Sequence, residues 1–237
     1  MSNTYFQFRQ FRIEQQHCAM KVTTDACIQG AWTPIQPHVK RVLDIGAGTG
    51  LLSLMLAQRN PGILIDAIEL DTAATAQATE NISASPWHDR ICILQGDATN
   101  YPFPHKYDLI ICNPPFFSNS LLSSTQQKTM ARHTLSLSQN DLFTIINDNL
   151  TDDGYASILL PIAEYQQWHT LIKNNGWHEV GKLSVSHTPG AQVKRVVSLC
   201  SKNVMEIAGE HQLVIKDSNQ QYAPDFTALL SPFYLQL

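Results

Sequence analysis

Short apolar runs alternate along the chain with amphipathic or alanine-rich segments. Five runs are short, apolar and bounded by turn residues, which is typical of buried strands: Val42–Ile45, Ile63–Leu70, Ile91–Gln95, Tyr107–Cys112 and Tyr155–Leu160. Helices are predicted between them at Leu51–Gln58, Asp71–Ile82 and Gln139–Leu150. This alternation predicts a parallel, doubly wound sheet with right-handed crossovers.

The C-terminal third predicts a change of strand direction. Trp177–His187 and Val193–Cys200 read as strands, and the turn at Pro189-Gly190 between them is short enough to make them antiparallel. We therefore expect an α/β, Rossmann-like, doubly wound fold whose seven-stranded sheet is mostly parallel, with one antiparallel strand near the C-terminus. A short strand (HQLVIKD) and a helix near Asp225–Leu230 follow in the tail.

The first 37 residues form a segment of their own ahead of the first strand of the sheet. Residues 4–16 alternate aromatic and polar positions, which favours an edge strand or a hairpin. Thr23-Thr24-Asp25 is a helix-start signal, and Pro34 and Pro37 end that helix and bound a linker. The interpretation is a short N-terminal cap at residues 1–37 and a main domain at residues 38–237.

The balance of charge neither indicates nor excludes a nucleic-acid partner. The 237 residues carry a formal net charge of −4, and phosphate contacts require Lys and Arg. A local basic face is sufficient, however, and six residues are candidates for it: Arg9, Arg12, Lys21, Arg41, Lys194 and Arg195. The alternative is that these charges are dispersed and solvated.

The cysteines indicate whether a metal site is expected, and the apolar runs indicate whether the protein is expected in a membrane or in the cytoplasm. The five cysteines share no C-x-x-C spacing, so they indicate neither a disulfide framework nor a zinc site, and no metal is expected. No run approaches about 18 apolar residues, and the N-terminus has no signal-peptide core. We therefore expect a cytoplasmic protein that does not bind a membrane.

A glycine-rich turn follows the first strand of the sheet. Gly46, Gly48 and Gly50 let the backbone turn sharply and let a ligand approach the positive end of the next helix. The spacing is G-x-G-x-G, which fits a dinucleotide less well than G-x-G-x-x-G, and Asp44 would repel a pyrophosphate. A cationic or zwitterionic ligand fits better, and a purely structural βα turn is the alternative.

Two carboxylates follow the ends of the next two strands. Glu69 lies about 20 residues beyond the glycine turn, where nucleotide-binding units hold ribose hydroxyls. Asp97 follows the next strand, where it can accept a hydrogen bond from an adenine amino group.

The chain is organised around Asn113, Pro114, Pro115 and Phe116, directly after the strand Tyr107–Cys112. The two prolines cannot extend the strand, so they form a rigid turn at its carboxyl end, where ligands bind in open α/β sheets. The Asn113 side-chain oxygen and the Pro114 carbonyl can each accept an N–H of a planar amine, and Phe116 can stack on its ring. These contacts orient the nitrogen lone pair and stabilise positive charge developing on nitrogen. A structural Pro-Pro turn is the alternative.

Together these motifs resemble those of class I S-adenosylmethionine-dependent methyltransferases. VLDIGAGTG, IEL, GDA and NPPF occur in the expected order between Val42 and Phe116. The resemblance implies S-adenosyl-L-methionine as the cofactor. By this resemblance, the amino-acid part of the cofactor is lined by Asp44, Gly46, Gly48 and Gly50. Glu69, with Leu70 beside it, binds the ribose of the cofactor. Asp97 and Ala98 flank its adenine, and Asn113 also touches the cofactor.

The flanks of these motifs narrow the substrate. NPP-aromatic motifs occur in enzymes that methylate adenine amines of DNA and RNA, guanine amines of rRNA, and glutamine amides of release factors. Here the segments FRQFRIEQQHCAMKVTTDACIQGAW, ARHTLSLSQNDL and DFTALLSPFYL resemble the tRNA(Val) adenine-37 N-6 methyltransferase family. That resemblance implies methyl transfer to the exocyclic N-6 amine of an adenine next to the anticodon, with the tRNA anticodon loop as partner.

The same resemblance assigns roles to less distinctive residues. The N-terminal cap would pack on the cofactor site, with Lys21, Thr24 and Asp25 closing it. Residues 117–137 read as a loop beside the site, and Arg132 and His133 are candidates for contact with a phosphate or a base of RNA; the alternative is a solvated loop. We expect a monomer. The alternatives are methylation of another RNA base or of a protein glutamine amide and, in a different class, a non-catalytic S-adenosylmethionine-binding module.

Overall fold

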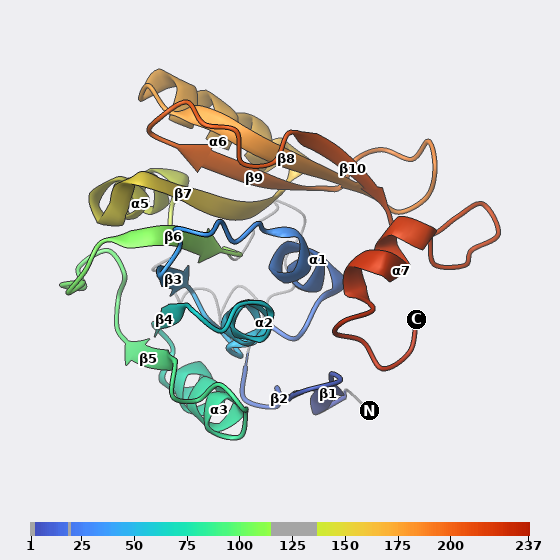
Figure 1. Cartoon of the computed structure of the whole chain (residues 1–237), viewed down its shortest axis with the longest axis horizontal. Helices are drawn as coiled ribbons and strands as arrows, with labels where there is room; N and C mark the ends of the chain where they lie inside the picture. The colour runs from blue at the N-terminus through green and yellow to red at the C-terminus, as the bar shows by residue number, and fades with distance from the viewer. Residues whose placement is uncertain (1–2, 19, 115–136) are drawn as a thin grey trace, which may run out of the picture.

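The centre of the protein is an eight-stranded sheet with the strand order β10-β8-β9-β7-β6-β3-β4-β5 (Figure 1). The computed structural model describes residues 3–18, 20–114 and 137–237. Within them the sheet comprises β3 (Arg41–Ile45), β4 (Leu64–Glu69), β5 (Ile91–Gln95), β6 (Tyr107–Cys112), β7 (Leu150–Pro161), β8 (His178–Ser186), β9 (Arg195–Ser201) and β10 (Glu210–Val214).

The predicted strand directions are confirmed, and the predicted strand number is low by one. Strands β5, β4, β3, β6 and β7 pair in parallel, and β9 pairs antiparallel with both β7 and β8. The additional strand is β10 in the tail, which pairs in parallel with β8 and buries Leu213. It joins the sheet because the outer edge of β8 would otherwise present unpaired backbone groups.

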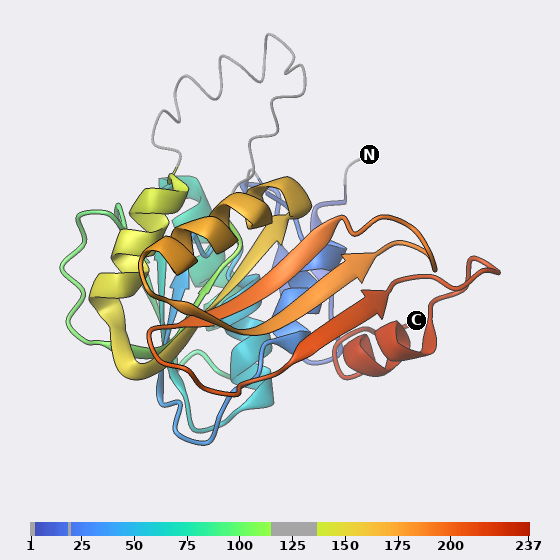
Figure 2. The ribbon, with the colours of Figure 1, turned by 90° about the horizontal axis from the view of Figure 1, so that it is seen from above.

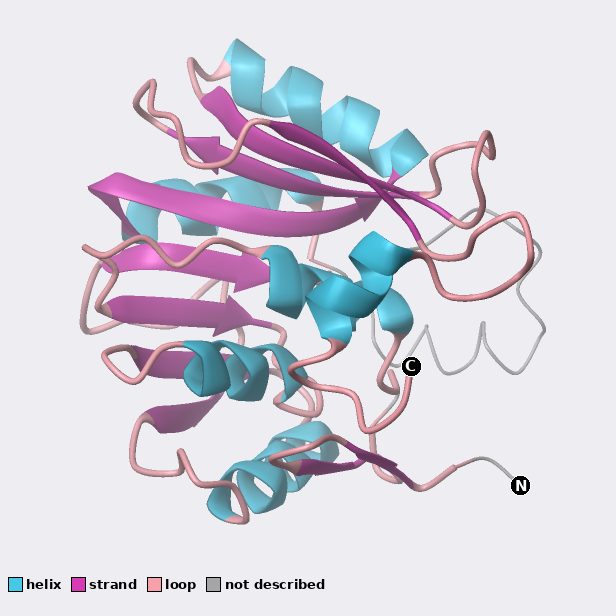
Figure 3. Cartoon of the chain, turned by 45° about the vertical axis from the view of Figure 1, so that its right-hand side comes forward, coloured by secondary structure: helices cyan, strands magenta, loops and turns pink. Residues whose placement is uncertain are grey.

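Helices cover both faces of the sheet (Figure 2, Figure 3). One face carries α1 (Thr24–Trp32), α2 (Leu51–Arg59), α3 (Thr72–Ser83) and α7 (Pro224–Leu230), and the other carries α5 (Gln139–Asn149) and α6 (Ile162–Asn174). Alternate residues of one strand therefore enter different cores: Ile111 packs with the first group and Ile110 with the second. Across these described segments, no helix is both long and apolar enough to span a membrane.

Three predicted helix starts are confirmed by their caps. The Thr23 side chain accepts a hydrogen bond from the Ala26 amide at 3.2 Å, and the Asp71 side chain accepts one from the Ala74 amide at 2.8 Å. Ser138 forms a reciprocal capping box with the residue three positions on. These side chains satisfy amides that the first turn of a helix leaves unpaired.

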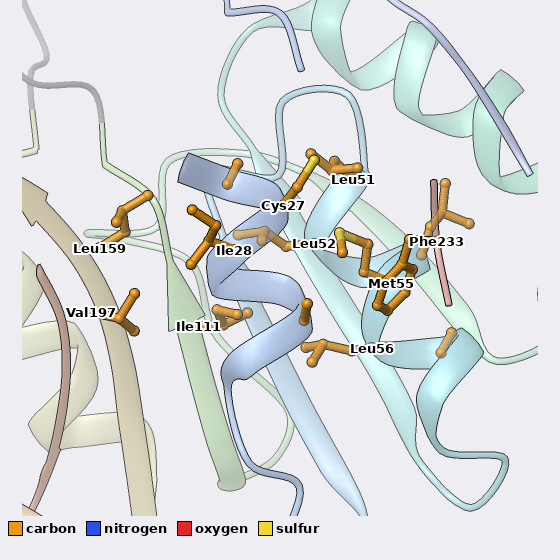
Figure 4. Close-up of a cluster of buried hydrophobic side chains, with 14 of the residues drawn as sticks. Cys27, Ile28, Leu51, Leu52, Met55, Leu56, Ile111, Leu159, Val197 and Phe233 are labelled. Carbon is orange, nitrogen blue, oxygen red and sulfur yellow. The ribbon is translucent and has the colours of Figure 1, made fainter. Parts of the chain in front are cut away.

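The N-terminal segment packs tightly on the main domain. It consists of a hairpin of β1 (Tyr5–Gln7) and β2 (Arg12–Glu14), followed by α1. Figure 4 shows α1 lying between the strands and α2, with Ile28 near Ile111. The two helices approach so closely that a Cβ on Gly30 would lie 2.8 Å from the Met55 sulfur.

A buried amide holds α1 to the sheet. The Gln29 side chain is completely buried, and its Nε2 donates to the carbonyl oxygens of Cys112 and Ser157, both at 3.0 Å. Beside it, the hydroxyls of Thr33 and Ser157 are hydrogen-bonded at 2.7 Å. The helix of the N-terminal segment is thus bonded to the last residue of β6 and to the middle of β7.

Replacing this amide tests how much the attachment contributes. We expect Gln29→Leu to lower the free energy of unfolding by about 1–3 kcal/mol, because it leaves two buried carbonyls without this donor. Urea denaturation would measure the change. The matched control is Gln167→Leu, at an exposed position of α6, which should stay within about 0.5 kcal/mol. Equal effects at the two positions would contradict a specific role for the Gln29 bonds.

Candidate functional site

Four predicted site residues meet at the carboxyl edge of the parallel strands. Ile45 at the end of β3 pairs with Ile68 on one side and with Cys112 on the other. Gly46, Glu69 and Asn113 each follow one of these three residues, so they occupy neighbouring places along the edge. Asp97 extends the row, because Glu69 pairs with Gln95 of β5. The structure therefore brings together residues that are far apart in the sequence.

The glycine turn is a tight, open loop that leads into α2. Gly46, Gly48 and Gly50 have φ angles of +72°, +55° and +81°, which side chains of L-residues rarely tolerate. The amides of Gly46 and Ala47 donate to the Ile68 carbonyl at 2.9 and 3.0 Å, which fixes the turn against β4. A Cβ on Gly46 would find nothing within 4 Å. The turn therefore offers free space in which a ligand can lie against its backbone.

Asp44 is a buried carboxylate beneath this turn. It is 0% exposed, and its Oδ2 accepts hydrogen bonds from the amide and hydroxyl of Ser53 at 3.2 and 2.7 Å. Its Oδ1 has no hydrogen-bond partner among the described residues. Burial raises the pKa of Asp44 to about 6, the Ser53 bonds oppose this rise, and the charge of Glu69 adds to it. An unpaired buried carboxylate oxygen favours a cationic group in a ligand.

Glu69 joins the glycine turn to the start of α3. Its Oε2 accepts from the Gly48 amide at 2.8 Å and its Oε1 from the Asp71 amide at 2.9 Å. A carboxylate can accept about four hydrogen bonds, so each oxygen retains capacity for a ligand hydroxyl. The next residue, Leu70, is 46% exposed, and it offers an apolar surface beside that carboxylate.

Asp97 and Ala98 lie at the far end of the row. The Asp97 Oδ1 accepts from the amide and hydroxyl of Thr99 at 2.9 and 2.8 Å, and these bonds lower the pKa of Asp97. The preceding Gly96 donates its amide to the Glu69 carbonyl at 3.0 Å, which couples this turn to β4. Ala98 is partly buried against the second core.

Asn113 and Pro114 directly follow β6, beside the glycine turn. The Asn113 Oδ1 is buried and has no partner in the described part of the chain, and Pro114 is buried. An acceptor of this kind is costly to bury unless a ligand or water pairs with it. The predicted partners Pro115 and Phe116, and the RNA-contact candidates Arg132 and His133, lie outside the described residues.

The three candidates from the N-terminal segment lie around the start of α1. Lys21 is exposed and its Nζ donates to the Asn3 carbonyl at 3.3 Å, and Thr24 is exposed at the first position of the helix. Asp25 forms an ion pair with Arg195 of β9 at 3.0 Å. Their contact with a cofactor stays a prediction.

The structure adds two polar residues that sequence reasoning missed. Ser53 pairs with Asp44, as described above. Asn81 of α3 is 3% exposed; its Nδ2 donates to the carbonyls of Glu14 and Thr49, both at 2.9 Å, and its Oδ1 accepts from the Glu14 amide at 2.8 Å. Asn81 thus bonds the N-terminal hairpin to the glycine turn. An amide within an alanine-rich helix is the signal that could have indicated it.

Fold and site together define a class I methyltransferase with a Rossmann-like sheet. The family model described as "Methyltransferase small domain" matches residues 32–178. Among solved structures, a predicted O-methyltransferase from Agrobacterium tumefaciens aligns with a TM-score of 0.68 at 16% identity, covering 88% of this chain and 96% of that one. The glycopeptide N-methyltransferase MtfA aligns with a TM-score of 0.55 at 13% identity, covering 81% and 100%. At these identities the likeness is one of fold.

Relatives of higher identity define the family more narrowly. A protein of Tolumonas auensis is 41% identical over 100% of this chain and 99% of its own length, and one of Dyadobacter fermentans is 40% identical over 99% and 98%. Both are named tRNA1(Val) (adenine(37)-N6)-methyltransferase. The chain belongs to the tRNA1(Val) (adenine(37)-N6)-methyltransferase family.

The raised pKa of Asp44 predicts a pH dependence of stability. Between the ordinary value of 3.8 and about 6, the folded, cofactor-free protein holds a proton at Asp44 that the unfolded chain has released. The free energy of unfolding should therefore fall through this window as the pH rises, by about 3 kcal/mol in all. Asp44→Asn should remove this fall, whereas Asp153→Asn, at an exposed position, should retain it. Denaturation series across the window would be compared; an unchanged slope in Asp44→Asn would contradict the burial argument.

Replacing Glu69 should weaken cofactor binding much more than it slows methyl transfer. We expect Glu69→Ala to raise the cofactor dissociation constant by roughly 10- to 100-fold, because it removes a ligand acceptor and releases the Gly48 amide. The single-turnover rate at saturating cofactor should change much less. Calorimetry and rapid-quench assays would measure the two quantities. The control is Glu80→Ala, whose carboxylate accepts from Gln77 within α3; an unchanged dissociation constant in Glu69→Ala would refute the assignment.

Proposed function

We propose that this chain transfers a methyl group from S-adenosylmethionine to the N6 amine of adenine 37 in tRNA1(Val). The observation that carries the proposal is the buried Asn113 Oδ1 beside the glycine turn, for which the described residues supply no partner. The names of the full-length relatives support the substrate. The same edge of the sheet thereby holds a methyl donor and an acceptor for amine hydrogens.

The residues at this edge fit S-adenosylmethionine. Asp44, with Gly46, Gly48 and Gly50, would hold its amino-acid part, and the orphaned Asp44 Oδ1 suits a positively charged ammonium group. Glu69, with Leu70 beside it, would accept hydrogen bonds from the ribose hydroxyls, and Asp97 and Ala98 would flank the adenine. When bound, the cofactor supplies an electrophilic methyl group on a sulfonium.

Asn113 and Pro114 prepare the acceptor amine. An exocyclic amine on an aromatic ring is a weak nucleophile because its lone pair is delocalised into the ring. The Asn113 Oδ1 and the Pro114 carbonyl would each accept one N–H, which turns the lone pair toward the methyl group. The same two oxygens stabilise positive charge as it develops on nitrogen. Phe116 would stack on the base. A strong general base is not required, because the proton can leave after transfer.

The N-terminal segment, residues 1–37, would form a cap on the cofactor site. Its attachment supports this role: Asn81 bonds the hairpin to the glycine turn, and Gln29 bonds α1 to the end of β6. Lys21, Thr24 and Asp25 would close the site from this cap. The protein would act as a cytoplasmic monomer on the anticodon loop, whose adenine is already unpaired and is less costly to present than a base in a duplex.

A methylation assay separates this proposal from its alternatives. The purified protein would be incubated with labelled S-adenosylmethionine and a tRNA1(Val) transcript, and nucleosides would be identified by mass spectrometry. We expect N6-methyladenosine from the natural transcript and none from a transcript with guanosine at position 37. Parallel incubations would contain rRNA or a glutamine-bearing protein substrate in place of the transcript. Label confined to these would favour another amine substrate, and no label in any incubation would favour a cofactor-binding module.

Asn113 is the residue whose replacement tests the proposed mechanism of methyl transfer. Asn113→Ala should lower the single-turnover rate by about 100-fold or more, because it removes an acceptor that acts on developing charge. The cofactor dissociation constant should stay within a few-fold. Asn203→Ala, which removes an exposed amide bonded to the Asp152 carbonyl, is the control and should leave both quantities unchanged. The Asn113 Oδ1 and the Pro114 carbonyl together form the proposed amine clamp, and near-normal transfer by Asn113→Ala would contradict it.

A further inference from the structure

The cofactor candidates that belong to the sheet occupy one half of the row of carboxyl strand ends. They lie at the ends of β3, β4 and β5, which are on one side of β6, and Asn113 directly follows β6 itself. On the other side of β6 lie β7, β9, β8 and β10. Because β8 and β10 run parallel to β7, their carboxyl ends reach the same edge, as does the first residue of the antiparallel β9. A polymer whose base enters the clamp has this second half of the edge available.

Two lysines stand at this second half. Lys194 is exposed, and its amide donates to the Val185 carbonyl at 2.9 Å, which places it at the end of β8. The Lys216 amide donates to the His187 carbonyl at 2.9 Å, which places it just beyond β10. Figure 1 and Figure 3 show the two loops that carry these residues projecting beyond the strand ends. Backbone hydrogen bonds thus hold both lysines in place.

An exposed aromatic ring lies next to the second lysine. Tyr222 is 45% exposed, although its ring stacks on the fully buried Phe226 with centroids 4.9 Å apart. It pairs with Lys216 across an antiparallel bridge, and the Lys216 Nζ lies 5.8 Å from the centre of its ring. A partly exposed ring that rests on a buried ring can offer an unpaired base a surface for stacking.

The acidic residues nearby are engaged with neighbouring groups or lie at a helix start. Asp217 accepts the amides of Asn219 and Gln221 at 2.8 and 3.0 Å, which orders the loop that carries Tyr222. Asp25 is paired with Arg195, and Asp225 and Glu164 lie in the first turns of α7 and α6. Negative charge in a first turn is partly offset by the helix dipole.

We propose that a ledge formed by Lys194, Lys216 and Tyr222 binds the anticodon arm of the tRNA. Lys194 and Lys216 contact backbone phosphates, and Tyr222 stacks on an unpaired base. Four strand spacings separate β6 from β10 in the sheet, or about 19 Å, so the arm spans from the clamp to the ledge. This inference rests on the proposed function, because it takes the target base to enter at Asn113.

Charge-matched variants test the lysines. The double variant Lys194→Glu with Lys216→Glu would be compared with Lys40→Glu and Lys106→Glu, two exposed lysines that precede β3 and β6 at the opposite edge. Binding of tRNA1(Val) would be followed by fluorescence anisotropy at several salt concentrations. We expect the ledge variant to bind at least tenfold more weakly, with a salt slope smaller by about 1 to 2, and the control to stay within about twofold.

Two substitutions of Tyr222 test whether its aromatic ring contributes to tRNA binding. Tyr222→Phe retains the aromatic face and should bind tRNA as the wild type does. Tyr222→Leu retains apolar packing on Phe226 but offers no aromatic face, and it should bind about tenfold more weakly with an unchanged salt slope. The cofactor dissociation constant should be unchanged in every variant, which reports an intact fold.

Two results would overturn the ledge: equal weakening by the ledge and control pairs, or wild-type affinity in both the lysine double variant and Tyr222→Leu. Fluorescence anisotropy measures tRNA binding independently of methyl transfer. A wild-type protein that binds tRNA but does not methylate it would therefore contradict the proposed function. The comparison of binding affinities among the variants would still test the ledge.

Discussion

The register between β3 and its neighbours is the constraint on which the site depends. Ile45 pairs with Ile68 and Cys112, so the glycine turn, Glu69 and Asn113 emerge side by side from three strands. A parallel sheet aligns the carboxyl ends of its strands at one edge, and a shift of a single residue would turn each side chain to the opposite face. The methyl donor and the acceptor amine, as proposed, could meet only while this register holds.

Buried polar atoms secure this arrangement and also leave part of it unsatisfied. Gln29 and Asn81 bond the N-terminal segment to the end of β6 and to the glycine turn, so this segment and the row of strand-end residues form one hydrogen-bonded unit. At the same edge, Asp44 and Asn113 retain oxygens that have no partner among the residues the structure describes. Unpaired buried acceptors cost stability, and a cationic cofactor and an amine substrate are the ligands that would relieve that cost.

The sequence predicts most of the fold and the row of strand-end residues, because apolar runs, caps and turn residues act locally. It does not predict β10 as a member of the sheet, since that pairing depends on the exposed edge of β8. Gln29 and Asn81 were missed because a buried amide looks like a solvated one until its partners are known. The residues predicted to form a basic face do not lie together. Lys194 and Arg195 lie at the end of the sheet that carries the candidate site, whereas Arg41 begins β3 at the opposite end. Sequence alone could not separate them.

The most direct test of the account is a structure of the protein with S-adenosylhomocysteine and an RNA anticodon stem-loop of tRNA1(Val). The account predicts that the N6 atom of adenine 37 lies about 3 Å from the Asn113 Oδ1, within hydrogen-bond distance, and also within reach of the Pro114 carbonyl. An adenine bound elsewhere, or an Asn113 oxygen paired with another protein group while the base is in place, would contradict it.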